Sequence, residues 1–218
     1  MQNGLIDTAA QATTPDDRRI YGVVIAEVIE NCDRTVMGRV RVRFSWLPGY
    51  EPWARVAAAM AGDDRGVYVM PRAGDEVLVV FNHGDVREPY VIGSVWNGNG
   101  KPPVTAPDDA GTKWVIRTAK GHEIVFDDTA GSIHIKTGTK QTVTLTDKQI
   151  ELSVDDDKTT AITLDTQGNL TIKAKQTLTL EAQSIKLRGT DKVAIQGGTV
   201  DLDGGSQCTI DATRIDIG

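Results

Sequence analysis

The chain has 218 residues, enough for one large domain or two small ones. Its formal net charge of -6 argues against a nucleic-acid-binding protein, which normally presents a basic face. The N-terminal stretch lacks the apolar core of a signal peptide, and no later stretch is long enough to span a membrane. We therefore expect a protein made in the cytoplasm without a signal peptide and with no nucleic acid among its partners.

Composition divides the chain near residue 112. All eight prolines lie at or before Pro107, and residues 1–112 hold ten of the thirteen arginines but one of the eleven lysines. Proline and glycine in the stretch before Thr112 oppose both helix and strand, which predicts a connector. The predicted organisation is a flexible N-terminal arm (1–19), a first domain (20–98), a Pro/Gly connector (99–112) and a second domain (113–218).

Six short β-like runs, separated by turn signals, precede the connector. So many short strands in about eighty residues favour a small closed barrel, of which the OB-fold is the commonest kind. We interpret Trp46, Trp53 and Trp96 as core and rim of this barrel. The alternative, a base-stacking platform, is disfavoured by the 15 acidic and 11 basic residues of 1–112. The runs are 20–30, 38–47, 52–60, 66–70, 75–82 and 89–97.

From Leu170 to the end of the chain, the apolar residues recur as i, i+2 pairs. The steps between pair starts are 8, 7, 8, 7, 8 and 7, a fifteen-residue repeat that contains two strands. Four upstream pairs, starting at Ile133, Val143, Ile150 and Ile162, follow the pattern loosely. Periodicity of this kind predicts a solenoid or a fibrous element.

One copy of this ribbon cannot bury its apolar residues, because each short strand turns a single row inward. A single-chain β-helix must supply three sides and needs longer coils, whereas three identical chains can each supply one side of every layer. Pairing between the chains also removes open strand edges. We therefore predict an all-β homotrimer. Its predicted trimer core consists of Leu170, Ile172, Leu178, Leu180, Ile185, Leu187, Val193, Ile195, Val200, Leu202, Cys208 and Ile210.

The sequence shows no pattern of a catalytic, cofactor-binding or metal site. Asp127 and Asp128 are adjacent, so on a strand they would face opposite ways, and we interpret them as part of a turn. The segment 201–205 lacks the spaced acidic ligands of a calcium loop. Cys32 and Cys208 have no ligand spacing with another Cys or His, and Cys208 falls in an inward slot of the repeat. We predict a protein that is not an enzyme.

Several motifs resemble the central spike of contractile injection systems, the family of phage baseplate assembly protein V and the VgrG spikes. They are "GRVRVRFSWLPGYEPWARVA", "PRAGDEVLVVFNHGDVREPYVIGSVWNGNGKPP" and "KGHEIVFDDTAGSIHI", and the resemblance covers roughly residues 20–218. It implies three OB-folds as a collar above an intertwined triple-stranded β-helix, or β-prism. Such a needle leads the tail tube through the target envelope, with transient contact with the target membrane.

The sequence departs from relatives in ways that predict its partners. No hub domain precedes the barrel, so we expect a separate hub protein above the collar, and no lytic insert interrupts the chain. No histidine follows His134, which disfavours a metal-clamped tip. We expect a PAAR-like tip protein to dock on Thr213, Ile215, Ile217 and Gly218.

Two hypotheses remain for the function. The first is a non-enzymatic spike that pierces the target envelope and joins the hub to a tip cap. The alternative is a baseplate module with a glycan-binding or cell-wall-lytic role, in which the barrel recognises a glycan or the needle carries an enzyme. An inserted catalytic domain would distinguish the two, and the connector is too short to hold one. The particle itself, a phage virion, a bacteriocin or an extracellular or cell-associated injection device, stays open.

Overall fold

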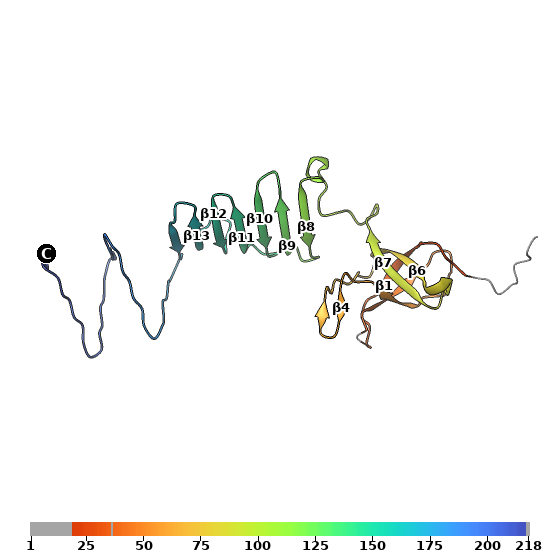
Figure 1. Ribbon diagram of the computed structural model, residues 1–218, viewed down its shortest axis with the longest axis horizontal. Coiled ribbons are helices and arrows are strands. Elements are labelled where there is room, and N and C mark those ends of the chain that lie inside the picture. The colour runs from red at the N-terminus through yellow and green to blue at the C-terminus, as the bar shows by residue number, and fades with distance from the viewer. Residues whose placement is uncertain (1–18, 36, 217–218) are drawn as a thin grey trace, which may run out of the picture.

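The computed structural model describes residues 19–35 and 37–216. Over these residues the chain is all-β apart from two short 3-10 helices, which confirms the predicted class. The molecule is elongated, with a barrel at one end, a flat sheet beyond it and a C-terminal ribbon at the other end (Figure 1). No described helix is long and apolar enough to cross a membrane.

Five strands close into a barrel in the order β1-β2-β3-β7-β6. Neighbours are antiparallel except β3 and β7, which run parallel. Alternate residues point inward, as in β6, and the core is built mainly from valine around Phe44. The barrel strands are β1 (Val24–Glu30), β2 (Arg39–Arg43), β3 (Trp53–Val56), β6 (Glu76–Phe81) and β7 (Pro89–Val95).

One predicted strand run, 66–70, is not part of the barrel. Only its first residue is in a strand. The strands β4 (Ala61–Gly62) and β5 (Arg65–Gly66), of two residues each, form a short hairpin that projects from the barrel (Figure 1). We name residues 57–70 the arm. The prediction of a barrel strand here was wrong, since residues 66–69 face solvent and only Met70 packs against the core.

The three tryptophans of the barrel domain lie outside its buried core. Trp46 and Trp96 are exposed, and Trp53 is half-buried beside the guanidinium of Arg39, 5.9 Å from the ring centre. Phe44 fills the interior and contacts Phe81, with ring centres 5.7 Å apart. We predicted that these tryptophans form the core and the rim of the barrel, and all three lie on its outer part.

The second structural unit is a seven-stranded antiparallel sheet, which we name the proximal sheet. Each strand pairs with the next one along the chain, in the order β14-β13-β12-β11-β10-β9-β8. The 3-10 helix η2 (Pro107–Asp109) ends the connector, and Asp109 forms an ion pair of 3.0 Å with Lys113. The strands are β8 (Lys113–Arg117), β9 (Glu123–Asp127), β10 (Ser132–Lys136), β11 (Thr142–Thr146), β12 (Gln149–Ser153), β13 (Ala161–Asp165) and β14 (Leu170–Lys173).

Beyond the proximal sheet the described chain forms no strand. Residues 174–216, which we name the distal ribbon, run as a zigzag of extended legs (Figure 1). Glycines stand at the corners: a Cβ atom at Gly189 would collide with the carbonyl oxygen of Lys192, and one at Gly204 with that of Gln207. Only glycine leaves room for the chain to turn this tightly.

Candidate functional site

The most extensive unusual surface of the described chain is one side of the proximal sheet. The strand register places two continuous rows of apolar side chains across all seven strands, and we name this side the apolar face. One row is Trp114, Phe126, Ile133, Leu145, Ile150, Leu164 and Leu170. The other row is Ile116, Ile124, Ile135, Val143, Leu152, Ile162 and Ile172.

None of the fourteen side chains of the apolar face is buried. Trp114 is 74% exposed and Ile116 65%, whereas members in the middle of the rows are less exposed: Leu152 is 42% exposed, and Ile133 and Leu145 are half-buried. Soluble proteins rarely leave so long an apolar stripe in water, and such stripes mark surfaces that bind other proteins or membranes. The apolar face therefore is a surface built for contact.

The opposite side of the proximal sheet, the polar face, is satisfied within the chain. Glu151 is buried there and its carboxylate lies 2.8 Å from the ammonium group of Lys158. The ring of His134 lies 3.1 Å from the hydroxyl of Ser132 and 3.2 Å from that of Thr144. The two sides of the sheet thus differ. The side chains of the polar face find hydrogen-bond and ion-pair partners within the chain, whereas those of the apolar face remain exposed.

Carboxylates of the proximal sheet hold its turns. Asp127 accepts a hydrogen bond of 2.8 Å from the backbone N–H of Ala130, and this bond is the largest cause of the lowered pKa of Asp127. Lys113 adds an attraction that lowers the pKa further. Asp165 accepts bonds from the side chain and backbone of Asn169, which also lower its pKa. The interpretation of Asp127 as part of a turn agrees with this geometry.

The histidines are held apart in three different places. His83 lies in the β6–β7 turn, the Nδ1 atom of His122 accepts a 3.0 Å bond from the N–H of Gly138, and His134 lies on the polar face. Within residues 19–35 and 37–216, no three His, Cys, Asp or Glu side chains are grouped so that they could hold a metal ion.

The predicted trimer-core residues fall into two groups. Leu170 and Ile172 lie on β14, at the end of the two rows of the apolar face. The other large apolar members lie on the distal ribbon, where they are about 50–67% exposed in the single chain, and Cys208 is exposed as well. Their burial between chains stays a prediction.

The predicted tip residues are described only in part. Thr213 and Ile215 lie in the last leg of the distal ribbon, and Ile215 is 54% exposed. Ile217 and Gly218 lie outside the described residues, and so do residues 1–18 of the predicted N-terminal arm.

Sequence reasoning missed the first third of the apolar face. Trp114, Ile116, Ile124 and Phe126 extend the two rows onto β8 and β9, but we expected the repeat to start at Ile133. The signal was present, because these residues are also i, i+2 pairs. We overlooked these pairs because they directly follow the Pro/Gly connector.

Comparison with known proteins places the barrel in a family. Residues 24–96 match the family described as the type VI secretion system/phage-baseplate injector OB domain. The chain is 37% identical over 116 residues to the type VI secretion system spike protein VgrG3 of Vibrio cholerae, covering 48% of this chain and 11% of that protein. It is 33% identical over 131 residues to the spike protein VgrG2a of Pseudomonas aeruginosa, covering 53% of this chain and 15% of that protein.

A third relative carries a different name. The actin cross-linking toxin VgrG1 of Vibrio cholerae is 37% identical over 109 residues, which cover 45% of this chain and 10% of the toxin. The matches thus span between a tenth and a seventh of the length of these relatives.

The barrel therefore belongs to the class of injector OB domains found in type VI secretion systems and phage baseplates. The predicted resemblance to the VgrG-like spike family is confirmed, because residues 24–96 match the injector OB domain and the chain is similar to VgrG spike proteins.

Proposed function

We propose that three copies of the chain assemble into the central spike at the tip of a contractile injection system. The three barrels form a collar, the three apolar faces pack on one another, and the distal ribbons intertwine into a β-helical needle. The spike is non-enzymatic and pierces the target envelope by mechanical force. The observation that carries the proposal is the unbroken apolar face of the proximal sheet, attached to an injector OB domain.

The apolar face supports three-fold assembly on energetic grounds. Burial of a large aliphatic side chain contributes about 1.5–3 kcal/mol. Fourteen such side chains in each copy remain at least partly in water in the single chain. Three sheets that turn these rows toward a common axis bury the middle of both rows together, and they leave the polar face, with its internal ion pair, toward water.

The distal ribbon supports the same assembly through its backbone. Described residues 174–216 take part in no strand ladder, yet a folded backbone pairs nearly all of its N–H and C=O groups. Its apolar pairs recur at the same 7- and 8-residue steps in every copy, so identical legs of neighbouring copies can pair and close the core at once. The partners that the ribbon lacks are two more copies of itself.

In the proposed spike, each end contacts a different partner protein. The barrel end, with the turn between β6 and β7 farthest from the needle, faces a separate hub protein (Figure 1). The ribbon end, with Thr213 and Ile215, receives a PAAR-like tip protein, together with Ile217 and Gly218. Truncation of the chain after Ile210 should abolish capture of that tip protein, and equal capture by the truncated and full-length trimers would contradict the tip assignment.

The mass in solution tests the assembly. Light scattering at micromolar concentration should give about three times the chain mass of 23.5 kDa. Hydrogen exchange should then show slow amides along residues 178–210, as slow as those of β10 to β13. A stable, folded monomer, or fast exchange throughout the distal ribbon of a trimer, would overturn the proposal.

A further inference from the structure

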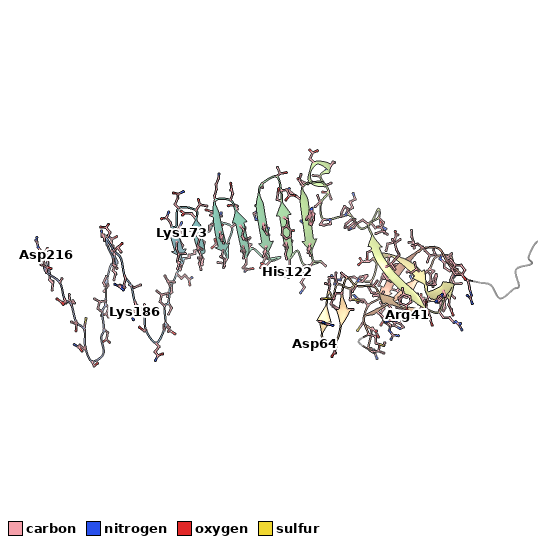
Figure 2. The ribbon with its side chains drawn as sticks, in the orientation of Figure 1. Arg41, Asp64, His122, Lys173, Lys186 and Asp216 are labelled. Atoms are coloured by element: carbon pink, nitrogen blue, oxygen red, sulfur yellow. The ribbon has the colours of Figure 1, made fainter. Side chains whose placement is uncertain are left out.

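The arm exposes an apolar surface that the barrel does not cover. Four of its large apolar side chains lie on either side of the β4–β5 hairpin and are at least half exposed, whereas Met70 at its end packs against the barrel core. Tyr68 and Val69 are each 78% exposed, Met60 is 54% and Val67 is 50% exposed. At the tip, Asp64 points into solvent, away from the barrel (Figure 2).

The first strand of the proximal sheet, β8, also exposes apolar side chains that lack a neighbour. β8 is an edge strand that pairs only with β9, so Trp114 and Ile116 have a neighbour on one side alone. This is why they are the most exposed members of the apolar face, at 74% and 65%, while Phe126 on the next strand is 42% exposed. Three packed sheets would still leave the collar end of their apolar core open to water.

Symmetry decides which surfaces of two copies can meet. A three-fold rotation moves every atom around the axis without changing its height along that axis. The strands of the proximal sheet succeed one another along the length of the molecule, so the needle axis follows this direction (Figure 1). The arm projects from the barrel toward β8 and lies at the height of the connector and of that strand (Figure 1). In a three-fold assembly the arm of one copy can therefore contact the connector or β8 of another copy, which lie at the same height.

We propose that the arm of each copy packs on Trp114 and Ile116 of a neighbouring copy and closes the collar end of the apolar core. This inference rests on the proposed trimer and adds a specific contact to it. The contact is head-to-tail, arm to β8, and such contacts close into a ring when the rotation is three-fold. The arm is thus an inter-subunit strap that ties the collar to the needle.

Charges around the two surfaces agree with this contact. Asp63 and Asp64 at the arm tip form no ion pair within the described chain, and the same holds for Lys101 in the connector. Packing of the arm on a neighbour brings the acidic tip toward that neighbour's connector. An exposed pair of this kind contributes little affinity but disfavours other orientations.

Cysteine cross-linking tests the strap. In a background with Cys32→Ser and Cys208→Val, the pair Val69→Cys and Ile116→Cys leaves Tyr68 and Trp114 in place as anchors. A short bis-maleimide should join the arm of one chain to β8 of the next, giving denatured species of two and three times the 23.5 kDa chain mass. The matched controls are the single variants Val69→Cys and Ile116→Cys, which report arm–arm and β8–β8 links across the axis and should give fewer multimers than the pair, and Val69→Cys with Trp96→Cys, on the barrel.

The outcomes separate the strap from the trimer. If light scattering finds a trimer but the 69–116 pair stays at single-chain mass, with or without an internal cross-link, the strap is wrong and the spike stands. Cross-linking of the 69–96 pair in preference to the 69–116 pair places the arm on the barrel and likewise overturns the strap. If the cysteine-free parent is a monomer, both inferences fail together.

Discussion

The proximal sheet and the distal ribbon share one sequence pattern and differ in where the backbone finds its partners. Both consist of short segments with i, i+2 apolar pairs, and both expose these pairs in the single chain. In the proximal sheet the hydrogen bonds of each strand are made to the next strand of the same chain. In the distal ribbon the described residues form no such ladder. The comparison teaches that an apolar pattern determines which side of a strand is apolar, but it does not determine with which strand that strand pairs.

A charge on the axis of the distal ribbon should have the largest effect. We expect Ile195→Asp to abolish the folded needle, because three carboxylates would meet in an apolar core without partners, at a cost of several kcal/mol for each chain. Light scattering and protease resistance of the region after Trp114 would measure the loss. Lys192→Ala, on the outward side, is the control and should leave both unchanged. A resistant trimer of the Ile195→Asp variant would show that this side of the ribbon is not the core.

A cavity in the apolar face should have the next largest effect. Leu152 is 42% exposed in the single chain, so Leu152→Ala would cost less than about 1 kcal/mol if the face stayed in water. If three sheets share a core, the same change should cost about 2–5 kcal/mol per chain. Thermal unfolding of the trimer distinguishes the two values. The control is Thr163→Ala on the polar face, and equal, small effects of both changes would contradict the shared core.

The first two predictions show how far the sequence alone could lead. Alternation predicted strands from Ile133 onward and placed Leu152 and Ile162 on one side, as the structure has them. It could not predict which strands pair within the chain, because the steps of 7 and 8 residues occur in both regions. The steps from Val143 to Ile150 and from Ile162 to Leu170 form hairpins, yet the next step of 8 does not. Local spacing permits either arrangement.

The candidate site was predictable to the same extent. The i, i+2 pairs identified the contact residues of the repeat, because burial of one side follows directly from the period of a strand. The arm was misread as a barrel strand, since "GVYVM" has the same alternation as a core strand. Whether such a segment enters the barrel depends on the space left by β3, β6 and β7, which only the folded chain reveals.

The ion pair of the polar face should have a smaller effect. Glu151 is buried and lies 2.8 Å from Lys158, which is itself more than half exposed. We expect Lys158→Ala to lower the stability of the proximal sheet by about 1 kcal/mol, because solvent screens part of the attraction but a buried carboxylate loses its partner. The control is Lys140→Ala, whose pair with Asp156 is largely in water and should contribute close to nothing. Calorimetry that finds the two variants equal would contradict the role of Glu151.

The smallest expected effect is a pH dependence of the last hairpin. Hydrogen bonds from Asn169 and the backbone hold the pKa of Asp165 below its usual value of 3.8. The bonds therefore stabilise the β13–β14 turn above pH ~4, and the contribution is lost as the pH falls through the lowered pKa of Asp165. Asp165→Asn should flatten the fall in melting temperature of the trimer between pH 5 and 2.

The nearest-neighbour pairing of the proximal sheet has a consequence for how the spike is made. Each of its strands meets the strand just before it, so one nascent chain can complete this sheet without waiting for another copy, as structures of low contact order do. In the proposed trimer the distal ribbon becomes ordered only after chains have met. The proximal sheets would then be the nucleus from which three ribbons zip together toward the C-terminus. Because they align the chains before zippering starts, they prevent a slip by one residue, which would turn every apolar pair of the needle outward.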